Sequence, residues 1–254
     1  MSTPDDQNTT PTNDNVISLA QAAERKKIQA ALAEKAKKKA AHEPFLKTGP
    51  LLALPPVTKY MILAFLAVHI ITDVILNPEQ QYWVFMNFGF VPGYYTGALP
   101  FGWQALTGPI TFTFLHGGWT HIILNGFMMM AFGTGVERWM GGKRLLAFFM
   151  LCNLFAALAQ FGLSPLSTAP VIGASGGLSG LFAAVLLMMQ QQNGLGSGNR
   201  YGILPFIALW ILISVLFGII GGPGGGSVAW AAHIGGFLAG FVLFKPVMTA
   251  RFLG

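Results

Sequence analysis

The stretch VIGASGGLSG, from Val171 to Gly180, places a serine among glycines at the start of an apolar run. Within it, GASGG from Gly173 to Gly177 fits the pattern GxSxG around Ser175. Glycines on both sides let the backbone turn sharply and let other groups approach the hydroxyl, as a nucleophilic serine requires. The same pattern also occurs on helix-packing surfaces, so alone it supports either interpretation. The rest of the chain has to decide between them.

The composition is that of a polytopic membrane protein. Of the 254 residues, 53% are hydrophobic and only 9% are charged, and the mean hydropathy is +0.57. A soluble domain needs a more polar surface than this composition provides. The single cysteine, Cys152, lies in an apolar run, which excludes a disulfide framework and a cysteine metal site. No metal-ligand spacing, phosphate-binding loop or nucleic-acid module occurs, so we expect no cofactor and no nucleic-acid partner.

A polar tail precedes the apolar part of the chain. Residues 1–50 hold eight of the fifteen Lys and Arg and are expected to be largely disordered or partly helical. Two interpretations of this tail stay open: a solvated leader, or a basic segment that contacts anionic membrane lipids. In the second, the contacting residues are Lys35, Lys37, Lys38 and Lys39. The tail is expected to end where a membrane domain, residues 51–254, begins.

We predict an all-α fold with six membrane-spanning helices. Each apolar span is long enough, or nearly so, for a bilayer of about 30 Å at about 1.5 Å per residue. The predicted spans are Val57 to Leu76, Trp119 to Val136, Leu145 to Leu163, Ala174 to Gln190, Ile203 to Ile220 and Val228 to Val247. The fourth span is the shortest, and Ser175 heads it. Its start should therefore lie below the outer membrane surface.

Charge bias predicts the orientation. If both termini are cytoplasmic, all fifteen Lys and Arg fall on the cytoplasmic side and the outer connections contain none. The long first outer connection, Asn77 to Gly118, is rich in aromatic residues and should lie in the membrane interface. The last outer connection, Gly221 to Ser227, is almost all glycine and is a candidate mobile cap.

Histidine 233 is the ionisable residue that best fits Ser175. Charged or ionisable groups within a bilayer are costly and are usually functional. Gly236 and Gly240 follow it as a GxxxG surface, and the fourth span carries small residues that complement this surface. Small residues facing each other would bring Ser175 and His233 within hydrogen-bond reach at similar depth. A serine and a histidine so placed are a nucleophile and its general base.

The second span offers donors for a developing oxyanion. His121 and Asn125 are four residues apart and share one face at its outer end. Together with the Ser175 backbone N–H, they would form an oxyanion hole. Taken singly, Asn125 could form a hydrogen bond between helices, and His121 could be a buried histidine with its hydrogen bonds made. Their shared face favours a functional role for both.

The other ionisable residues have simpler interpretations. His69 and Asp73, also four residues apart, are explained by a local hydrogen bond and by snorkelling near the outer end of the first span. Glu137 with Arg138 is interpreted as an interfacial ion pair at the inner end of the second span. No carboxylate is placed to join Ser175 and His233, which predicts a catalytic dyad.

These residues resemble the rhomboid intramembrane serine proteases of the bacterial six-helix type, over about Leu51 to Phe252. The motifs that match are GASG at Gly173 to Gly176, AHxxGxxxG at Ala232 to Gly240, HxxxN at His121 to Asn125 with the preceding His116, and GxxxExxxG at Gly133, Glu137 and Gly141. Where the family often has Trp-Arg in the first outer loop, this chain has Trp103-Gln104.

The resemblance implies a serine endopeptidase that cleaves membrane-anchored proteins in or near their transmembrane segment through an acyl-enzyme. It assigns Ser175 as nucleophile, His233 as general base, His121 and Asn125 as oxyanion donors, and His116 as a residue that orders the outer loop. The absence of a transit-like segment rich in Arg and Ser favours a bacterial inner membrane. Two other classes remain: a non-enzymatic relative that binds membrane helices, which would lack the serine or histidine, and a small transporter, which would show inverted halves.

Overall fold

The computed structural model describes residues 24–33, 53–191, 202–220 and 229–249. The backbone divides into two compact units, Met1–Lys47 and Thr48–Gly254. In the first unit, residues 24–33 form a helix whose side chains are all exposed. The lysines proposed to contact lipid and the glycine-rich connection from Gly221 to Ser227 lie outside the described residues.

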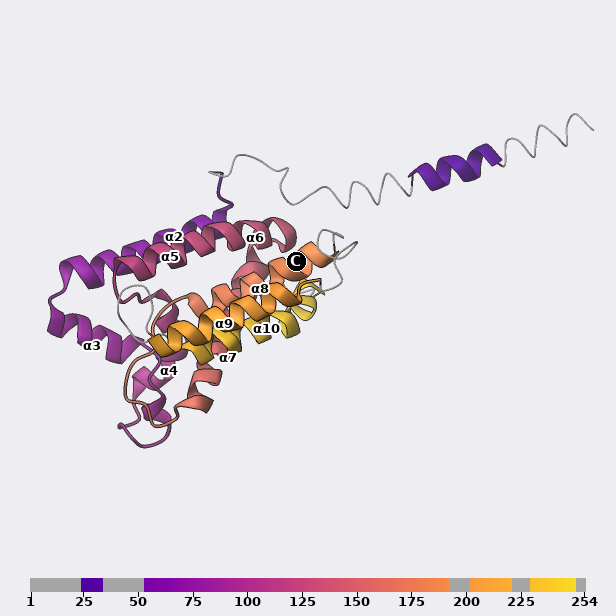
Figure 1. The fold of residues 1–254 in the computed structure, drawn as a ribbon. Helices are drawn as coiled ribbons and strands as arrows, with labels where there is room; N and C mark the ends of the chain where they lie inside the picture. The colour runs from indigo at the N-terminus through magenta and orange to yellow at the C-terminus, as the bar shows by residue number, and fades with distance from the viewer. Residues whose placement is uncertain (1–23, 34–52, 192–201, 221–228, 250–254) are drawn as a thin grey trace, which may run out of the picture. The chain divides into compact units, whose positions relative to one another are not determined.

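The described part of the second unit is helical, which confirms the all-α class (Figure 1). Its elements in chain order are α2 (Pro56–His69), η1 (Ile70–Ile75), α3 (Pro78–Phe88), η2 (Pro92–Tyr95), α4 (Trp103–Thr111), η3 (Phe112–Phe114), α5 (Trp119–Met128), η4 (Met129–Gly133), α6 (Thr134–Met140), α7 (Gly142–Leu163), α8 (Ser175–Gln191), α9 (Leu204–Ile220) and α10 (Trp230–Thr249).

Three of these helices are long and apolar enough to cross a membrane: Pro56–Ile75, Gly142–Leu163 and Trp230–Thr249. Together with the composition, they show an integral membrane protein. The segment predicted as the second span runs through α5, the π-helix η4 and α6. Helices α8 and α9 have 17 residues each, so both are short for a bilayer. Helix α8, which was predicted as the fourth span, begins at Ser175, one residue after the predicted start.

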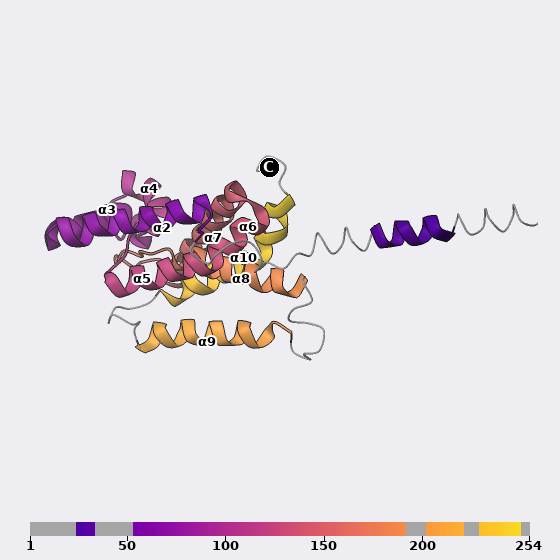
Figure 2. The same ribbon diagram turned by 90° about the horizontal axis from the view of Figure 1, so that it is seen from above.

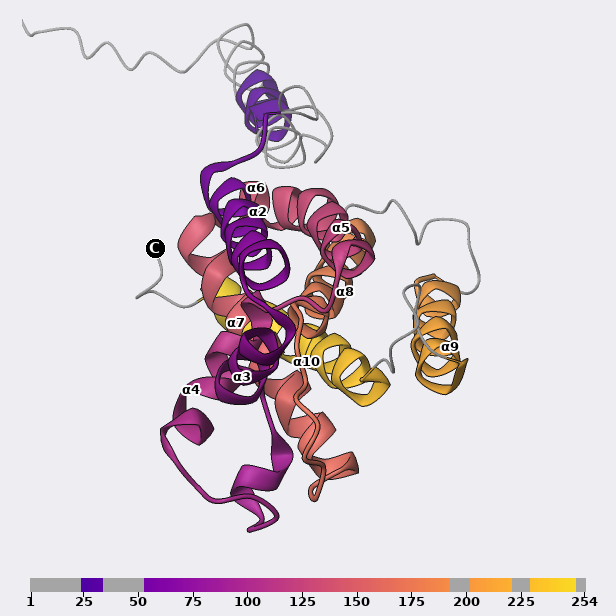
Figure 3. The same ribbon diagram turned by 90° about the vertical axis from the view of Figure 1, so that its left-hand side faces the viewer.

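Helices α7, α8 and α10 pack together as the centre of this unit (Figure 3). Small residues at their contacts let the backbones approach closely. Side chains of α8 are buried on all sides of the helix, which explains why its sequence shows no polar face. The helix that begins with Ser175 is therefore the most enclosed of the described helices.

Helix α9 lies at the edge, beside α10 (Figure 2). Its Trp210 packs on Phe182 of α8, with 4.9 Å between the ring centroids, and on Phe237 of α10 at 6.2 Å. Many of its other large side chains are exposed, among them Leu209, Leu212 and Ile219. In a membrane protein such a surface faces lipid.

The connection between η1 and α5 forms backbone hydrogen bonds with the segment that leads into α8. An isolated antiparallel bridge joins Phe90 to Val171, with hydrogen bonds of 3.0 and 2.8 Å between their backbones. The Gly173 N–H then donates to the Phe112 carbonyl at 2.9 Å. These bonds fix the backbone on the N-terminal side of Ser175.

Candidate active site

The Nε2 atom of His233 lies 2.8 Å from the Oγ atom of Ser175. The serine is the first residue of α8, and the histidine lies in the first turn of α10. For the Ser175 hydroxyl to donate its proton to Nε2, the neutral imidazole must carry its own proton on Nδ1. The pair has the geometry of a nucleophile and a general base.

Glycines bring these two helices together. A Cβ atom on Gly236 would stand 2.7 Å from the Gly176 carbonyl carbon, and one on Gly240 would stand 2.6 Å from the Gly180 carbonyl oxygen. Both distances are shorter than real Cβ contacts, so no larger residue fits. The contact of small residues expected from the sequence is present, and it sets the separation of Ser175 from His233.

Gly173 brings the chain against the donors of α5. Its φ of +117° lies in the region that favours glycine. A Cβ atom there would stand 2.7 Å from His121 Nε2 and 3.7 Å from Asn125 Nδ2. Asn125 is buried, and its Nδ2 has no hydrogen-bond partner among the described residues. Two side-chain nitrogens therefore face the backbone that precedes Ser175.

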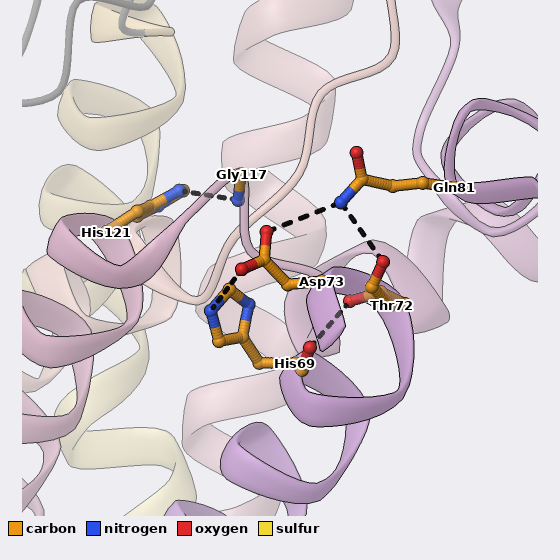
Figure 4. A network of polar contacts seen from close by, with 6 residues as sticks. All are labelled: His69, Thr72, Asp73, Gln81, Gly117 and His121. Carbon is orange, nitrogen blue, oxygen red and sulfur yellow. Dashed lines mark hydrogen bonds and ion pairs between the residues drawn. The ribbon is translucent and has the colours of Figure 1, made fainter. Parts of the chain in front are cut away.

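The proton on His121 can be assigned from its neighbour. The Gly117 backbone N–H donates to His121 Nδ1 at 3.3 Å, as Figure 4 shows. A ring nitrogen that accepts a hydrogen bond carries no proton, so the neutral imidazole carries its proton on Nε2. This is the nitrogen that faces Gly173. The tautomer makes His121 a donor towards the start of α8.

His116 packs behind His121 in the connection before α5. Its ring is buried and lies 5.1 Å from the His121 ring and 5.3 Å from the Phe65 ring, between centroids. Its Nδ1 is 3.2 Å from the Phe114 carbonyl oxygen, to which it donates. Burial lowers the pKa of His116 to about 3, and the proximity of His121 adds to the effect. The ring is therefore neutral at pH 7 and packs against the N-terminal end of α5.

The interpretation of His69 was wrong. Its Nε2 lies 3.9 Å from Asp73 Oδ2, which is too far for a hydrogen bond, and the ring is fully buried and does not snorkel (Figure 4). It packs edge-on against Trp119 with 4.8 Å between ring centroids. Asp73 also approaches Gln81 Nε2 at 3.5 Å. The first turn of α5 covers His69, and sequence spacing along α2 does not reveal this cover.

Glu137 also has a different partner from the one expected. Its Oε1 accepts from the Val57 N–H at 2.9 Å, and its Oε2 accepts from the N–H and the hydroxyl of Thr58 at 2.7 Å each. Arg138 instead donates to the Ala53 carbonyl at 2.9 Å. The carboxylate thus caps the N-terminus of α2, whose own N-cap residue is a proline without a capping side chain.

Sequence reasoning passed over Asn153 of α7. This residue is fully buried, and its Oδ1 accepts from the Gly177 N–H at 2.9 Å, two residues from Ser175. The sequence feature that could have indicated it is an amide side chain within an apolar span. Ser179, by contrast, bonds its own helix, since its Oγ donates to the Ser175 carbonyl at 2.7 Å.

Comparison with known proteins places the chain in a family. A family model described as the rhomboid domain matches residues 103–249. The putative rhomboid protease YdcA of Bacillus subtilis is 26% identical over 189 residues, which cover 70% of this chain and 89% of that protein.

Two further relatives match a smaller part of the chain. RHOMBOID-like protein 5 of Arabidopsis thaliana is 31% identical over 134 residues, 53% of this chain and 41% of its own length. Rhomboid protease GlpG of Yersinia pestis is 30% identical over 134 residues, 53% of this chain and 45% of its own length. The chain thus spans less than half the length of these two relatives. From the domain match and the membrane helices together, the chain belongs to the rhomboid family of intramembrane serine proteases.

Proposed function

We propose that this protein is an endopeptidase that cuts membrane-anchored proteins in or near their transmembrane segment, with Ser175 and His233 as a catalytic dyad. The observation that carries this proposal is the 2.8 Å contact between Ser175 Oγ and His233 Nε2. The substrates follow from the location of the site within a membrane domain. Helices that unwind easily should be preferred, because an intact helix holds its carbonyls in its own hydrogen bonds.

In the first step, Ser175 Oγ attacks the scissile carbonyl carbon while His233 Nε2 takes the hydroxyl proton. The carbonyl oxygen becomes an oxyanion, for which the proposed donors are the Ser175 N–H, His121 Nε2 and Asn125 Nδ2. His233 then gives its proton to the leaving amine nitrogen, the peptide C–N bond breaks, and an acyl ester remains on Ser175.

Water completes the cycle. His233 removes a proton from a water molecule as its oxygen attacks the ester, and the same proton returns to Ser175 Oγ when the C–O bond breaks. The products are a carboxylic acid and the free enzyme. Gly173, Gly176, Gly236 and Gly240 support this chemistry through the backbone approach that they allow, and His116 and Glu137 support it through the helix ends that they hold.

We further propose six membrane crossings with both termini in the cytoplasm and an interfacial first outer loop. The three long apolar helices support the first, third and sixth of these crossings. The distribution of all fifteen Lys and Arg supports the orientation. Exposed Trp83, Phe101 and Trp103 in the first connection suit an interface with lipid headgroups. We propose the bacterial cytoplasmic membrane, because YdcA, the relative above with the widest match, is bacterial.

The test is cleavage of a model membrane-anchored substrate by the purified protein in liposomes. Ser175→Ala and His233→Ala should each abolish cleavage, and a fluorophosphonate probe should label the wild type at Ser175 but neither variant. Ser179→Ala is the matched control, since Ser179 lies on the same helix and bonds only backbone. It should keep both cleavage and labelling. Cleavage by Ser175→Ala at the wild-type rate would refute the proposal.

A further inference from the structure

The first turn of α8 has an unusual arrangement of backbone donors. The Leu178 N–H is the first in this helix to reach an intrahelical carbonyl, that of Ala174, at 3.0 Å. The N–H groups of Ser175, Gly176 and Gly177 precede it and have no acceptor within the helix. A polar side chain at the N-cap normally takes one of them, but the N-cap here is Ala174, whose side chain has no acceptor.

Asn153 supplies the missing acceptor from α7. Its Oδ1 accepts from the Gly177 N–H at 2.9 Å, and its Nδ2 donates to the Phe149 carbonyl at 3.2 Å. The residue is fully buried, and both polar atoms of its side chain are bonded. The second bond holds the amide to its own helix, so the acceptor has a fixed position. Glu137 caps α2 from another helix in the same way.

This cap has two consequences for the nucleophile. It fixes the turn that carries Ser175 but leaves the Ser175 N–H free of the cap. The proposed oxyanion hole requires this N–H as a donor. It also ties that turn to α7, and α7 supports α10 as well: a Cβ atom on Gly235 would stand 3.0 Å from the Phe155 carbonyl oxygen. One helix thus holds both Ser175 and His233 in place.

We propose that Asn153 is a positioning residue for the peptidase reaction, acting through the Gly177 N–H to aim Ser175 at His233. This inference rests on the proposed function. An error of about 1 Å in the position of a catalytic group can cost about a hundredfold in rate. Loss of the cap should therefore lower kcat while leaving substrate binding nearly unchanged.

The experiment compares two substitutions of similar size at this position, assayed in liposomes. Asn153→Leu removes the acceptor, whereas Asn153→Asp keeps an oxygen in the same place. In its protonated form the aspartic acid also has an O–H that can donate to the Phe149 carbonyl. Cys152→Ala is the control for loosened packing, since Cys152 faces Gly180 in the same contact between helices but lies away from Gly177.

For Asn153→Leu we expect kcat to fall at least about tenfold with KM within about twofold, and a matching loss of the labelling rate at Ser175. Asn153→Asp should recover kcat to within about threefold of the wild type, because it restores the acceptor. Cys152→Ala should lower the melting temperature with little change in kcat.

Three results would overturn the inference. They are unchanged kcat in a folded Asn153→Leu protein, an equal loss of kcat in Asn153→Asp and Asn153→Leu, or a loss of kcat in Cys152→Ala as large as that in Asn153→Leu. Ser175→Ala is measured in parallel. If it remains inactive while Asn153→Leu is fully active, the inference about Asn153 fails and the proposed function stands. If Ser175→Ala is active, the proposed function itself fails.

Discussion

Gly236 of α10 rests on the backbone of Gly176 of α8 with no space for a methyl group between them. We therefore expect Gly236→Ala to push the two helices apart and to lengthen the contact between Ser175 and His233. Overpacking of this kind costs about 1 to 3 kcal/mol of stability. Cleavage should fall more steeply than stability, at least about a hundredfold, because the dyad spans this contact. Initial rates and melting temperatures in the same detergent measure both effects.

Gly162 of α7 provides the matched control, since nothing lies within 4 Å of a Cβ atom built there. Alanine in a helix is favoured over glycine by up to about 1 kcal/mol, so Gly162→Ala should be neutral or slightly stabilising and fully active. If Gly236→Ala cleaves as fast as Gly162→Ala, the close approach at Gly236 does not set the geometry of the dyad.

Asn125→Ala should slow turnover without weakening substrate binding. Its buried Nδ2 has no partner among the described residues and faces the backbone before Ser175, as an oxyanion donor should. Removal of one such donor costs about 2.7 to 4 kcal/mol in the transition state, or about 10² to 10³ in kcat. Steady-state kinetics would show kcat reduced and KM nearly constant. A rise in KM with unchanged kcat would instead mean that Asn125 binds the substrate in its ground state.

The sequence predicted best those contacts that follow from helical spacing or from small residues on facing helices. His121 and Asn125 are one helical turn apart and share one face as expected, and that face meets Gly173. The contact of Ser175 with His233 could be reasoned out because glycines on both helices indicated a close approach and the outer loops set a similar depth. These predictions needed only helix periodicity and the sizes of side chains.

Contacts that depend on tertiary packing could not be found in this way. The bonds from Glu137 to Val57 and Thr58 join residues 80 and 79 positions apart, and an adjacent Arg138 made a local ion pair the simpler interpretation. His69 is covered by Trp119 of α5, and the sequence does not reveal how α5 packs against α2. The π-helix η1 further rotates the end of α2, which ideal helical spacing misses.

Glu137→Ala should destabilise the protein strongly, because it leaves the N–H groups of Val57 and Thr58 without acceptors. Hydrogen bonds to charged groups contribute about 1.5 to 3 kcal/mol each, so we expect a loss of at least about 3 kcal/mol. Reversible unfolding in mixed micelles would measure it. Glu79→Ala is the control, because Glu79 is exposed in the first turn of α3. That variant should change stability by about 0.5 kcal/mol or less. Equal effects of the two substitutions would contradict the capping role.

His116 should make the protein less stable in acid. Its pKa is ordinarily 6.5 and burial lowers it to about 3 in the folded protein, so the unfolded chain takes up the proton first. Stability is then complete above about pH 6.5 and falls as the pH drops towards 3, by at most roughly 1.4 kcal/mol per pH unit for one group.

The comparison is between the wild type and His116→Phe, with melting temperatures measured in detergent from pH 7.5 to 4.5. Phenylalanine keeps the ring that packs on Phe65 but cannot take a proton. His69 of α2 and His121 of α5 face the same position and remain in both proteins. The acid slope should become shallower in the variant. At pH 7.5 the variant should lose only about 1 kcal/mol, from the missing hydrogen bond to the Phe114 carbonyl. Parallel melting curves across the whole pH range would mean that His116 takes up its proton equally in the folded and unfolded chain, which would contradict a lowered pKa.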